Sequence, residues 1–200
     1  RILHTINVNS GDPEDYSFNA MSGMYMNLGI EKSCNLTMPD WVTDEFYADL
    51  KAAVNAGSDY VLGEAGFGLP MDPQFAKLAS GFLLSEWMDN IDAVINGTST
   101  LKYYVYSGHD ATIDTMLIGM GQKSELIGPE NCDYAATIVC ELWENDGQHF
   151  IKLLFSPDID SGFQPFTRNL PGCGSDLCQL SDFQKFLEPF LATDDKICNV

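Results

Sequence analysis

One stretch, Tyr104–Thr112, constrains the fold of this chain more than any other. The apolar segment 101–106 has the composition of a β-strand and is followed by Gly108, and a helical pattern begins directly after His109 and Asp110. A strand, a tight turn and a helix start place these two side chains at the carboxyl edge of a sheet, where open α/β sheets bind ligands. The free N–H groups of a helix start attract anions. The stretch therefore predicts an α/β fold with an imidazole and a carboxyl group facing an anion pocket.

The first half of the chain has mainly helical patterns. One helix is predicted after Asp40, which follows a proline and can act as the cap, and Gly57 is expected to stop it. A loop rich in glycine and proline follows, and a longer helix is predicted over 74–96. Gly81 lies inside that helix at a cost of about 1 kcal/mol relative to alanine, which a close approach of another backbone would explain.

In the second half of the chain the hydrophobic pattern changes, and strands are predicted as well as helices. A helix is predicted over 111–120, and strands are predicted over 136–143 and 149–155. The residues Asn145–Gly147 between the two strands are a hairpin signal. Ser181, with a glutamine three residues later, predicts a capping box at the start of a last helix.

The charge of the chain is strongly acidic, with 29 acidic and 10 basic residues and a net charge of −19 at pH 7. Nucleic-acid binding needs clustered lysines and arginines, which the sequence lacks, and an anionic membrane surface would repel the chain. No apolar run is long enough to cross a bilayer. The negative charge either serves to keep the chain soluble or indicates an acidic working environment. At acidic pH many of the carboxylates are protonated and repel one another less.

Six cysteines predict an oxidising compartment. Their spacing matches no zinc pattern, and no cofactor or metal is expected. Cys173 and Cys178 enclose a short flexible loop that a local disulfide would close. Asn35 and Asn96 lie in acceptor sequences for N-linked glycosylation, which agree with secretion beside the cysteines.

The three histidines limit the chemistry that the chain can perform. His4 and His149 have plain surroundings and are interpreted as structural or surface residues. On spacing alone, His109 is balanced between a site residue and a structural one. A metal-dependent phosphohydrolase would need more histidines than the chain has. A serine hydrolase would need a Gly-x-Ser-x-Gly motif, which the sequence around Ser107 does not match. No glycine-rich phosphate-binding loop precedes a helix.

Several segments nevertheless resemble one family, and they occur in that family's order. Residues 106–112 resemble the second catalytic motif of the histidine acid phosphatases, the group of the prostatic and lysosomal enzymes. The other matching landmarks are residues 33–41, 78–84, 141–143 and 168–173, with Cys178 following. The resemblance implies a partial phosphoglycerate-mutase-like sheet with flanking helices and part of a helical cap. It places the cap and a flanking helix in residues 1–97 and the carboxyl-terminal half of the core in residues 98–200.

The family mechanism uses a histidine nucleophile in an Arg-His-Gly-x-Arg-x-Pro motif, which takes the phosphoryl group before water releases it. By resemblance, His109 binds the phosphoryl group and Asp110 is the general acid for the departing alcohol. The resemblance further implies a small phosphate monoester as the substrate, a secreted or lysosomal location and a homodimer. The chain lacks the nucleophile motif and has only two arginines, Arg1 and Arg168, of which Arg168 lies where the family pattern is structural.

We therefore interpret the chain as the carboxyl-terminal portion of a longer phosphatase and expect it to be inactive alone. The alternative is a secreted phosphatase-like protein that binds a ligand or partner without catalysis, which the missing arginines would favour. We expect Cys34 to pair with Cys132 and Cys173 with Cys178. The partners of Cys140 and Cys198 are left open.

Overall fold

The computed structural model describes residues 1–11 and 17–192. Its contacts divide the chain into two compact units, Arg1–Tyr60 and Val61–Val200. The division lies ahead of the predicted boundary at 97/98, because the long helix that ends near that boundary shares its core with the second unit. The assignment of residues 1–97 to a phosphatase cap stays a prediction.

The first unit consists of helices. They are α1 (Ile2–Ser10), α2 (Phe18–Ser33) and α3 (Asp44–Val61), whose last residue belongs to the second unit. Their apolar faces form one small core with the buried residues Ile6, Leu28, Phe46, Leu50 and Val54.

Both predicted ends of the helix in this region were wrong. The helix begins at Asp44 rather than after Asp40, because the Thr43 hydroxyl accepts a hydrogen bond from the Phe46 N–H at 3.1 Å and caps the first turn. It also continues through Gly57. A β-carbon at Gly57 would collide with the ring of Phe18, so this glycine makes room for a neighbouring side chain instead of ending the helix.

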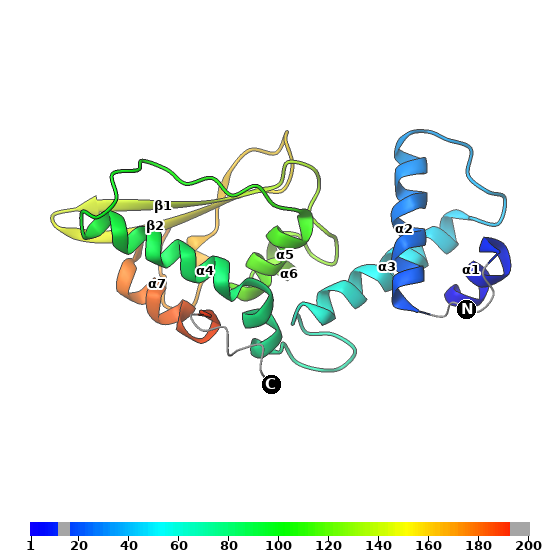
Figure 1. Ribbon diagram of the computed structural model, residues 1–200, viewed down its shortest axis with the longest axis horizontal. Helices are drawn as coiled ribbons and strands as arrows, with labels where there is room; N and C mark the ends of the chain where they lie inside the picture. Colours follow the sequence, from blue (N-terminus) through cyan, green and yellow to red (C-terminus); the bar gives the residue numbers. More distant parts are fainter. Residues whose placement is uncertain (12–16, 193–200) are drawn as a thin grey trace. The chain divides into compact units, whose positions relative to one another are not determined.

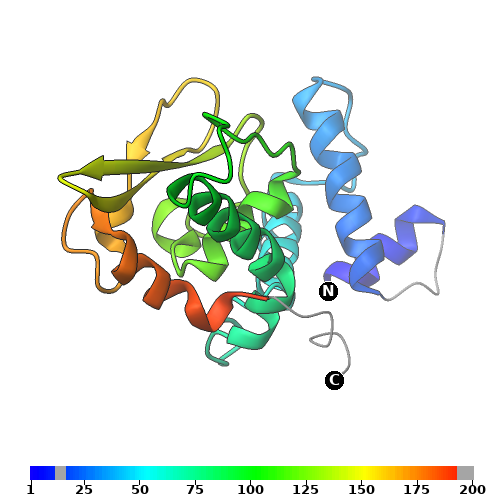
Figure 2. The same cartoon turned by 60° about the vertical axis from the view of Figure 1, so that its left-hand side comes forward.

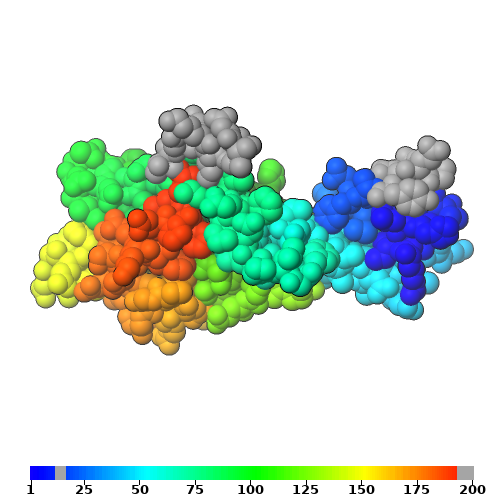
Figure 3. Space-filling view, turned by 90° about the horizontal axis from the view of Figure 1, so that it is seen from below, coloured from blue at the N-terminus to red at the C-terminus, as the bar shows by residue number. Residues whose placement is uncertain are grey.

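The second unit begins with α4 (Pro73–Ile95), which matches the predicted long helix closely and is capped by Asp72. Gly81 in its middle meets the backbone of η2 (Glu188–Phe190), since a β-carbon there would lie 2.9 Å from the Ala192 β-carbon and still closer to the Phe190 carbonyl oxygen. The close approach expected from the sequence is therefore present. Figure 3 shows the end of the described chain, in red, directly against the first half of α4, in teal.

The predicted hairpin is confirmed. Strands β1 (Thr137–Asn145) and β2 (Gln148–Ser156) pair antiparallel from Thr137↔Ser156 to Asn145↔Gln148. Asp146 and Gly147 both have positive φ, 52° and 75°, as a two-residue turn of this hand requires. Short strands β3 (Gln164–Pro165) and β4 (Cys178–Gln179) pair with β2. The result is a mixture of helices with a small antiparallel sheet, consistent with the predicted α/β class.

The remaining helices of the second unit are α5 (Asp110–Gly119), α6 (Lys123–Leu126), η1 (Thr167–Asn169) and α7 (Leu180–Leu187). Ile151, Leu153 and Phe155 alternate along β2 and are buried in the same core as Phe183 and Leu187 of α7. Figure 1 shows the hairpin lying across α4 and α7 in this unit.

The predicted cap at Ser181 was wrong. The N-cap of α7 is Gln179, and Ser181 is an exposed residue inside the helix. The helix starts earlier because Cys178 and Gln179 pair with β2 and lead directly into its first turn.

The predicted strand over 101–106 was also wrong. The segment is extended, but none of its residues belongs to a strand. Figure 2 shows it as an extended trace that runs over α4 and leads into α5. The physical reason is that β-propensity alone does not make a strand, which exists only when another strand pairs with its backbone.

Candidate active site at the start of α5

His109 and Asp110 lie together at the amino-terminal end of α5. His109 is the N-cap, with extended φ and ψ of −96° and 172°, and Asp110 is the first helical residue. Both side chains are exposed. The Asp110 Oδ1 atom accepts a hydrogen bond from the Ala111 N–H at 2.8 Å, and the Thr112 N–H donates to the His109 carbonyl oxygen at 3.0 Å. The Asp110 N–H is the group of the first turn that remains available to an anion. The pair thus brings an imidazole, a carboxyl group and a helix start together on the exposed surface. We call His109, Asp110 and the first turn of α5 the shelf.

Gly108 and Thr112 hold this turn in shape. The Thr112 hydroxyl accepts a hydrogen bond from the His109 N–H at 3.2 Å. A β-carbon at Gly108 would lie 2.9 Å from both Cβ and Oγ1 of Thr112, so only glycine allows the threonine to fold back over the turn. This contact explains why glycine precedes the histidine.

The extended segment before the turn is attached by its tyrosines to α4 and to the loop that follows α4. The Tyr106 hydroxyl accepts a hydrogen bond from the Asn90 amide at 2.6 Å, and the Tyr104 hydroxyl is 2.8 Å from that of Ser99. Partial burial raises the pKa of Tyr106, and the nearby Glu86 carboxyl group adds to the effect. These contacts position the chain that leads to His109.

A buried polar cluster lies further along α5. Asp114 is 3% exposed and accepts a hydrogen bond from the Cys132 thiol at 3.0 Å. Lys123 is fully buried, and its ammonium group donates to the Glu130 carbonyl oxygen at 2.8 Å. Desolvation raises the pKa of Asp114, although the Cys132 thiol and the Lys123 charge act in the opposite direction. Desolvation also raises the pKa of Cys132, so this thiol stays protonated.

Sequence reasoning missed this cluster. Asp114 lies among the apolar residues of the helix predicted over 111–120, between Ile113 and Leu117. A charged residue at such a position was the available signal, because buried charges need partners.

The Asp114→Asn variant tests the burial of this carboxyl group. Because the folded-state pKa of Asp114 is raised, ionisation costs the wild type stability as the pH rises above the ordinary aspartate value. Asparagine never ionises and can still accept the Cys132 hydrogen bond. We expect the two proteins to unfold at nearly the same urea concentration near pH 3.5, and the variant to become progressively more stable than the wild type toward pH 7.

The matched control is Asp89→Asn, which changes an exposed aspartate in the middle of α4. Its stability relative to the wild type should not change with pH over the same range. A flat difference for Asp114→Asn would show that Asp114 is solvated in the folded protein.

Both arginines form ion pairs in the described structure. Arg168 forms a bidentate ion pair with Asp176, with distances of 2.7 and 2.6 Å, and this pair lowers the pKa of Asp176. Arg1 lies 3.2 Å from Glu45 in the first unit. Arg168 therefore has the structural position that the resemblance implies.

The cysteine predictions were partly correct. The disulfide between Cys173 and Cys178 is present. Cys34 is an exposed thiol of the first unit, and the Cys132 thiol is buried against Asp114 in the second unit. The expected pair of Cys34 and Cys132 stays a prediction. Cys140 is also a free thiol, and burial raises its pKa to about 12. Cys198 lies outside the described residues.

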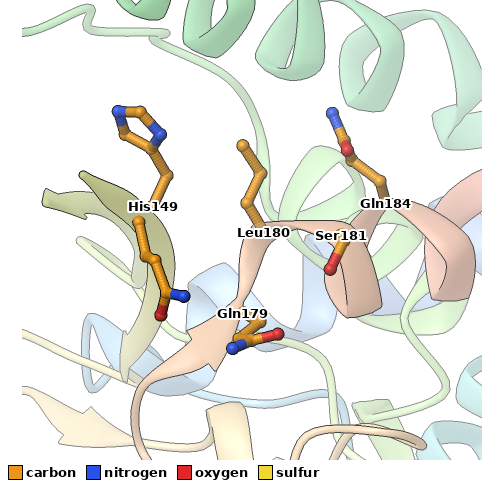
Figure 4. Close-up of a pocket in the computed structure, with 6 residues that line it drawn as sticks. His149, Gln179, Leu180, Ser181 and Gln184 are labelled. Carbon is orange, nitrogen blue, oxygen red and sulfur yellow. The ribbon is translucent and has the colours of Figure 1, made fainter. Parts of the chain in front are cut away.

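Other predicted residues lie apart from the shelf in sequence and surroundings. Asn35 and Asn96 are exposed, as glycosylation would require, and His4 is exposed on α1. His149 lines a separate depression of about 300 Å³ between β2 and α7, in which His149, Leu180 and Gln184 point into the same space (Figure 4). Its other lining residues are Gln148, Gln179 and Ser181. In the described part of the chain, no group of three or more His, Cys, Asp or Glu residues is arranged to hold a metal ion, and no helix is long and apolar enough to span a membrane.

Comparisons with known proteins all identify the same family. Residues 18–156 match the model of the histidine phosphatase superfamily (branch 2). The chain is 29% identical to the lysosomal acid phosphatase of Xenopus laevis over 181 residues, which is 90% of this chain and 39% of that protein. It is 26% identical to the prostatic acid phosphatase of Rattus norvegicus over 185 residues, 92% of this chain and 45% of that protein.

The human prostatic acid phosphatase is 25% identical over 177 residues, which cover 88% of this chain and 43% of that protein. The chain thus spans less than half the length of these relatives. The family match covers the hairpin, the long helix and the shelf at the start of α5. The chain therefore belongs to branch 2 of the histidine phosphatase superfamily.

Proposed function

We propose that this chain is part of an acid phosphatase and supplies the proton-donating half of its active site. The observation that carries the proposal is the exposed pair of His109 and Asp110 on the first turn of α5, held by Gly108 and Thr112. Relatives that match most of this chain are named lysosomal and prostatic acid phosphatases. The proposed substrate class is the phosphate monoesters.

In the proposed reaction, a histidine from another segment of the protein attacks the phosphorus atom, and the bond to the alcohol oxygen breaks. Asp110 gives its proton to that oxygen, so the product leaves as a neutral alcohol. A water molecule then attacks the phosphohistidine and loses a proton to the Asp110 carboxylate, which regenerates the acid and releases inorganic phosphate. His109 and the Asp110 N–H at the helix start would hold the phosphoryl oxygens.

Charge limits what this chain can do alone. A phosphate dianion needs cations around it, and arginine is the side chain best suited to hold it. The described arginines are engaged with Asp176 and Glu45, and the chain has a net charge of −19. The remaining cations and the nucleophile are therefore proposed to come from the part of the protein that corresponds to the unmatched length of the relatives.

The test compares the 200-residue chain with the full-length protein. We expect the full-length protein to hydrolyse p-nitrophenyl phosphate at acidic pH and to form a phosphoenzyme that is labile to acid and stable to base. The 200-residue chain should show neither property. A full-length protein that is folded but neither hydrolyses the substrate nor becomes phosphorylated would favour the alternative function, a phosphatase-like binding protein. Hydrolysis of the substrate by the 200-residue chain would place the nucleophile within that chain.

The compartment and the assembly belong to the same proposal. We propose a secreted or lysosomal location, with glycans on Asn35 and Asn96 and the Cys173–Cys178 disulfide formed there. Glycosidase treatment of the protein from its native source should lower its mass, and Asn35→Gln and Asn96→Gln should each remove part of that difference. A homodimer is part of the proposal, and sedimentation of the full-length protein tests it.

A further inference from the structure

The Tyr106 side chain, three residues before His109, is held by two residues of α4. Its hydroxyl accepts a hydrogen bond from the Asn90 amide at 2.6 Å and donates one to the Glu86 carboxylate. Glu86 and Asn90 lie four residues apart on α4, so their side chains share one face of the helix. A phenol hydroxyl has one hydrogen to donate and an oxygen that accepts, and both are used here. We call Glu86, Asn90 and Tyr106 the tyrosine clamp.

The turn that carries the shelf is attached to α4 on both of its sides. After the turn, α5 packs on α4 in the core, where Met88 of α4 lies in one buried cluster with Met116 and Leu117 of α5. Before the turn, the tyrosine clamp fastens the chain to the same helix. Three residues span at most about 10 Å when they are extended, so the clamp limits where His109 and Asp110 can lie.

The residues between the clamp and the shelf add little stiffness of their own. Ser107 and Gly108 are exposed, and glycine has more conformational freedom than any other residue. The Thr112 hydroxyl, which accepts a hydrogen bond from the His109 N–H, fixes the turn relative to α5. The tyrosine clamp therefore supplies the attachment on the other side of the turn.

We propose that Tyr106 is a positioning residue for proton transfer, which keeps Asp110 aligned with the departing oxygen through the tyrosine clamp. The inference rests on the proposed function, in which Asp110 gives its proton to that oxygen. Proton donor and acceptor atoms must approach to about 2.6–3.2 Å, so a small displacement of the turn is enough to slow the transfer. Tyr106 is not the proton donor itself, because partial burial and the nearby Glu86 raise the pKa of its hydroxyl.

Tyr106→Phe in the full-length protein removes the hydroxyl and keeps the ring. We expect the rate of enzyme phosphorylation by alkyl phosphates to fall about tenfold, and the rate with aryl phosphates of acidic phenols to change less than about twofold. The two classes differ because an alkoxide needs a well-placed acid in order to leave, whereas an acidic phenol does not. An equal fall for both classes would overturn the inference, since a loss of folded enzyme affects both alike.

Tyr103→Phe is the matched control. Tyr103 lies on the same extended segment, and it is 77% exposed, whereas the Tyr106 hydroxyl is held on α4. The control removes a phenol hydroxyl from the same segment but leaves the clamp intact. We expect both phosphorylation rates to stay within about twofold of the wild type. A selective loss with alkyl phosphates in Tyr103→Phe would contradict the role of the clamp.

A second substitution tests whether Tyr106 acts through its α4 partners. Asn90→Leu removes the amide that donates to the Tyr106 hydroxyl. Residues that act through one contact have effects that do not multiply, so we expect the double variant with Tyr106→Phe to be no slower than Tyr106→Phe alone. Effects that multiply would show that Tyr106 acts by a route other than the clamp, and would contradict the inference.

Nitrogen-15 relaxation of the 200-residue chain reads the clamp without any assay of catalysis. We expect backbone order parameters of about 0.85 for residues 107–109 in the wild type and below about 0.6 in Tyr106→Phe, with no change in β2. Equal order parameters in the two proteins would overturn the inference. A fall in Tyr106→Phe, together with a wild-type full-length protein that lacks phosphatase activity, would show that the clamp fixes the turn and would remove the proposed function instead.

Discussion

Replacing Phe183 with alanine should destabilise the second unit by about 3–5 kcal/mol, the largest stability effect that we expect from a single substitution. The ring is fully buried on α7, in the core that also contains Ile151, Leu153 and Leu187. Its removal loses the transfer free energy of the ring and leaves a cavity between α7 and the hairpin. The neighbouring elements cannot close it easily, because β2 is fixed by pairing with β1, β3 and β4.

Urea unfolding followed by tryptophan fluorescence measures this effect, with Trp41→Phe in every protein so that the signal comes from the second unit. Phe163→Ala is the matched control, because that ring is 50% exposed after β2 and should contribute less than about 1 kcal/mol. A similar loss for both variants would mean that α7 does not pack on the hairpin as described.

Local signals predicted much of this fold correctly. The hairpin was found because Asp146 and Gly147 can take positive φ, and the long helix was found from its period and its glycine stop. The helix start after His109 was predicted correctly, since the turn at Gly108 and the helical pattern are both local features. The sheet edge that was expected before it is absent, because residues 101–108 belong to no strand.

The errors arose where the outcome depends on a distant part of the chain. Gly57 was interpreted as a helix stop, but it provides space for Phe18, which no local pattern reveals. The segment 101–106 has strand propensity without a partner strand. The buried carboxyl group of Asp114, which accepts a hydrogen bond from the distant Cys132 thiol, was missed because Asp114 lies among the apolar residues of a helix.

The second large effect concerns Asp110. In the full-length protein, Asp110→Asn should slow the hydrolysis of alkyl phosphates by about 10²–10⁴-fold, because an alkoxide is a poor leaving group unless it is protonated as it departs. Asparagine keeps the shape of the side chain and can accept the same hydrogen bond from the Ala111 N–H, so the first turn of α5 should be retained. Aryl phosphates with acidic phenols need little proton donation and should be affected much less.

Asp133→Asn is the matched control. Asp133 is exposed, and its Oδ1 atom accepts a hydrogen bond from the next N–H, that of Tyr134, at 2.7 Å, as Asp110 does from Ala111. The control removes an acidic group with the same local bond from the same unit but from outside α5. We expect it to leave turnover of both substrate classes nearly unchanged.

The direct measurement of the proton-donor role is the rate of enzyme phosphorylation for a series of monoesters whose alcohols differ in acidity. In the wild type this rate should depend only weakly on the acidity of the leaving alcohol, because Asp110 protonates each one. In Asp110→Asn it should fall steeply as the alcohol becomes less acidic. Two parallel plots, lowered by the same factor at every leaving group, would contradict the assignment of Asp110 as the group that gives its proton to the departing oxygen.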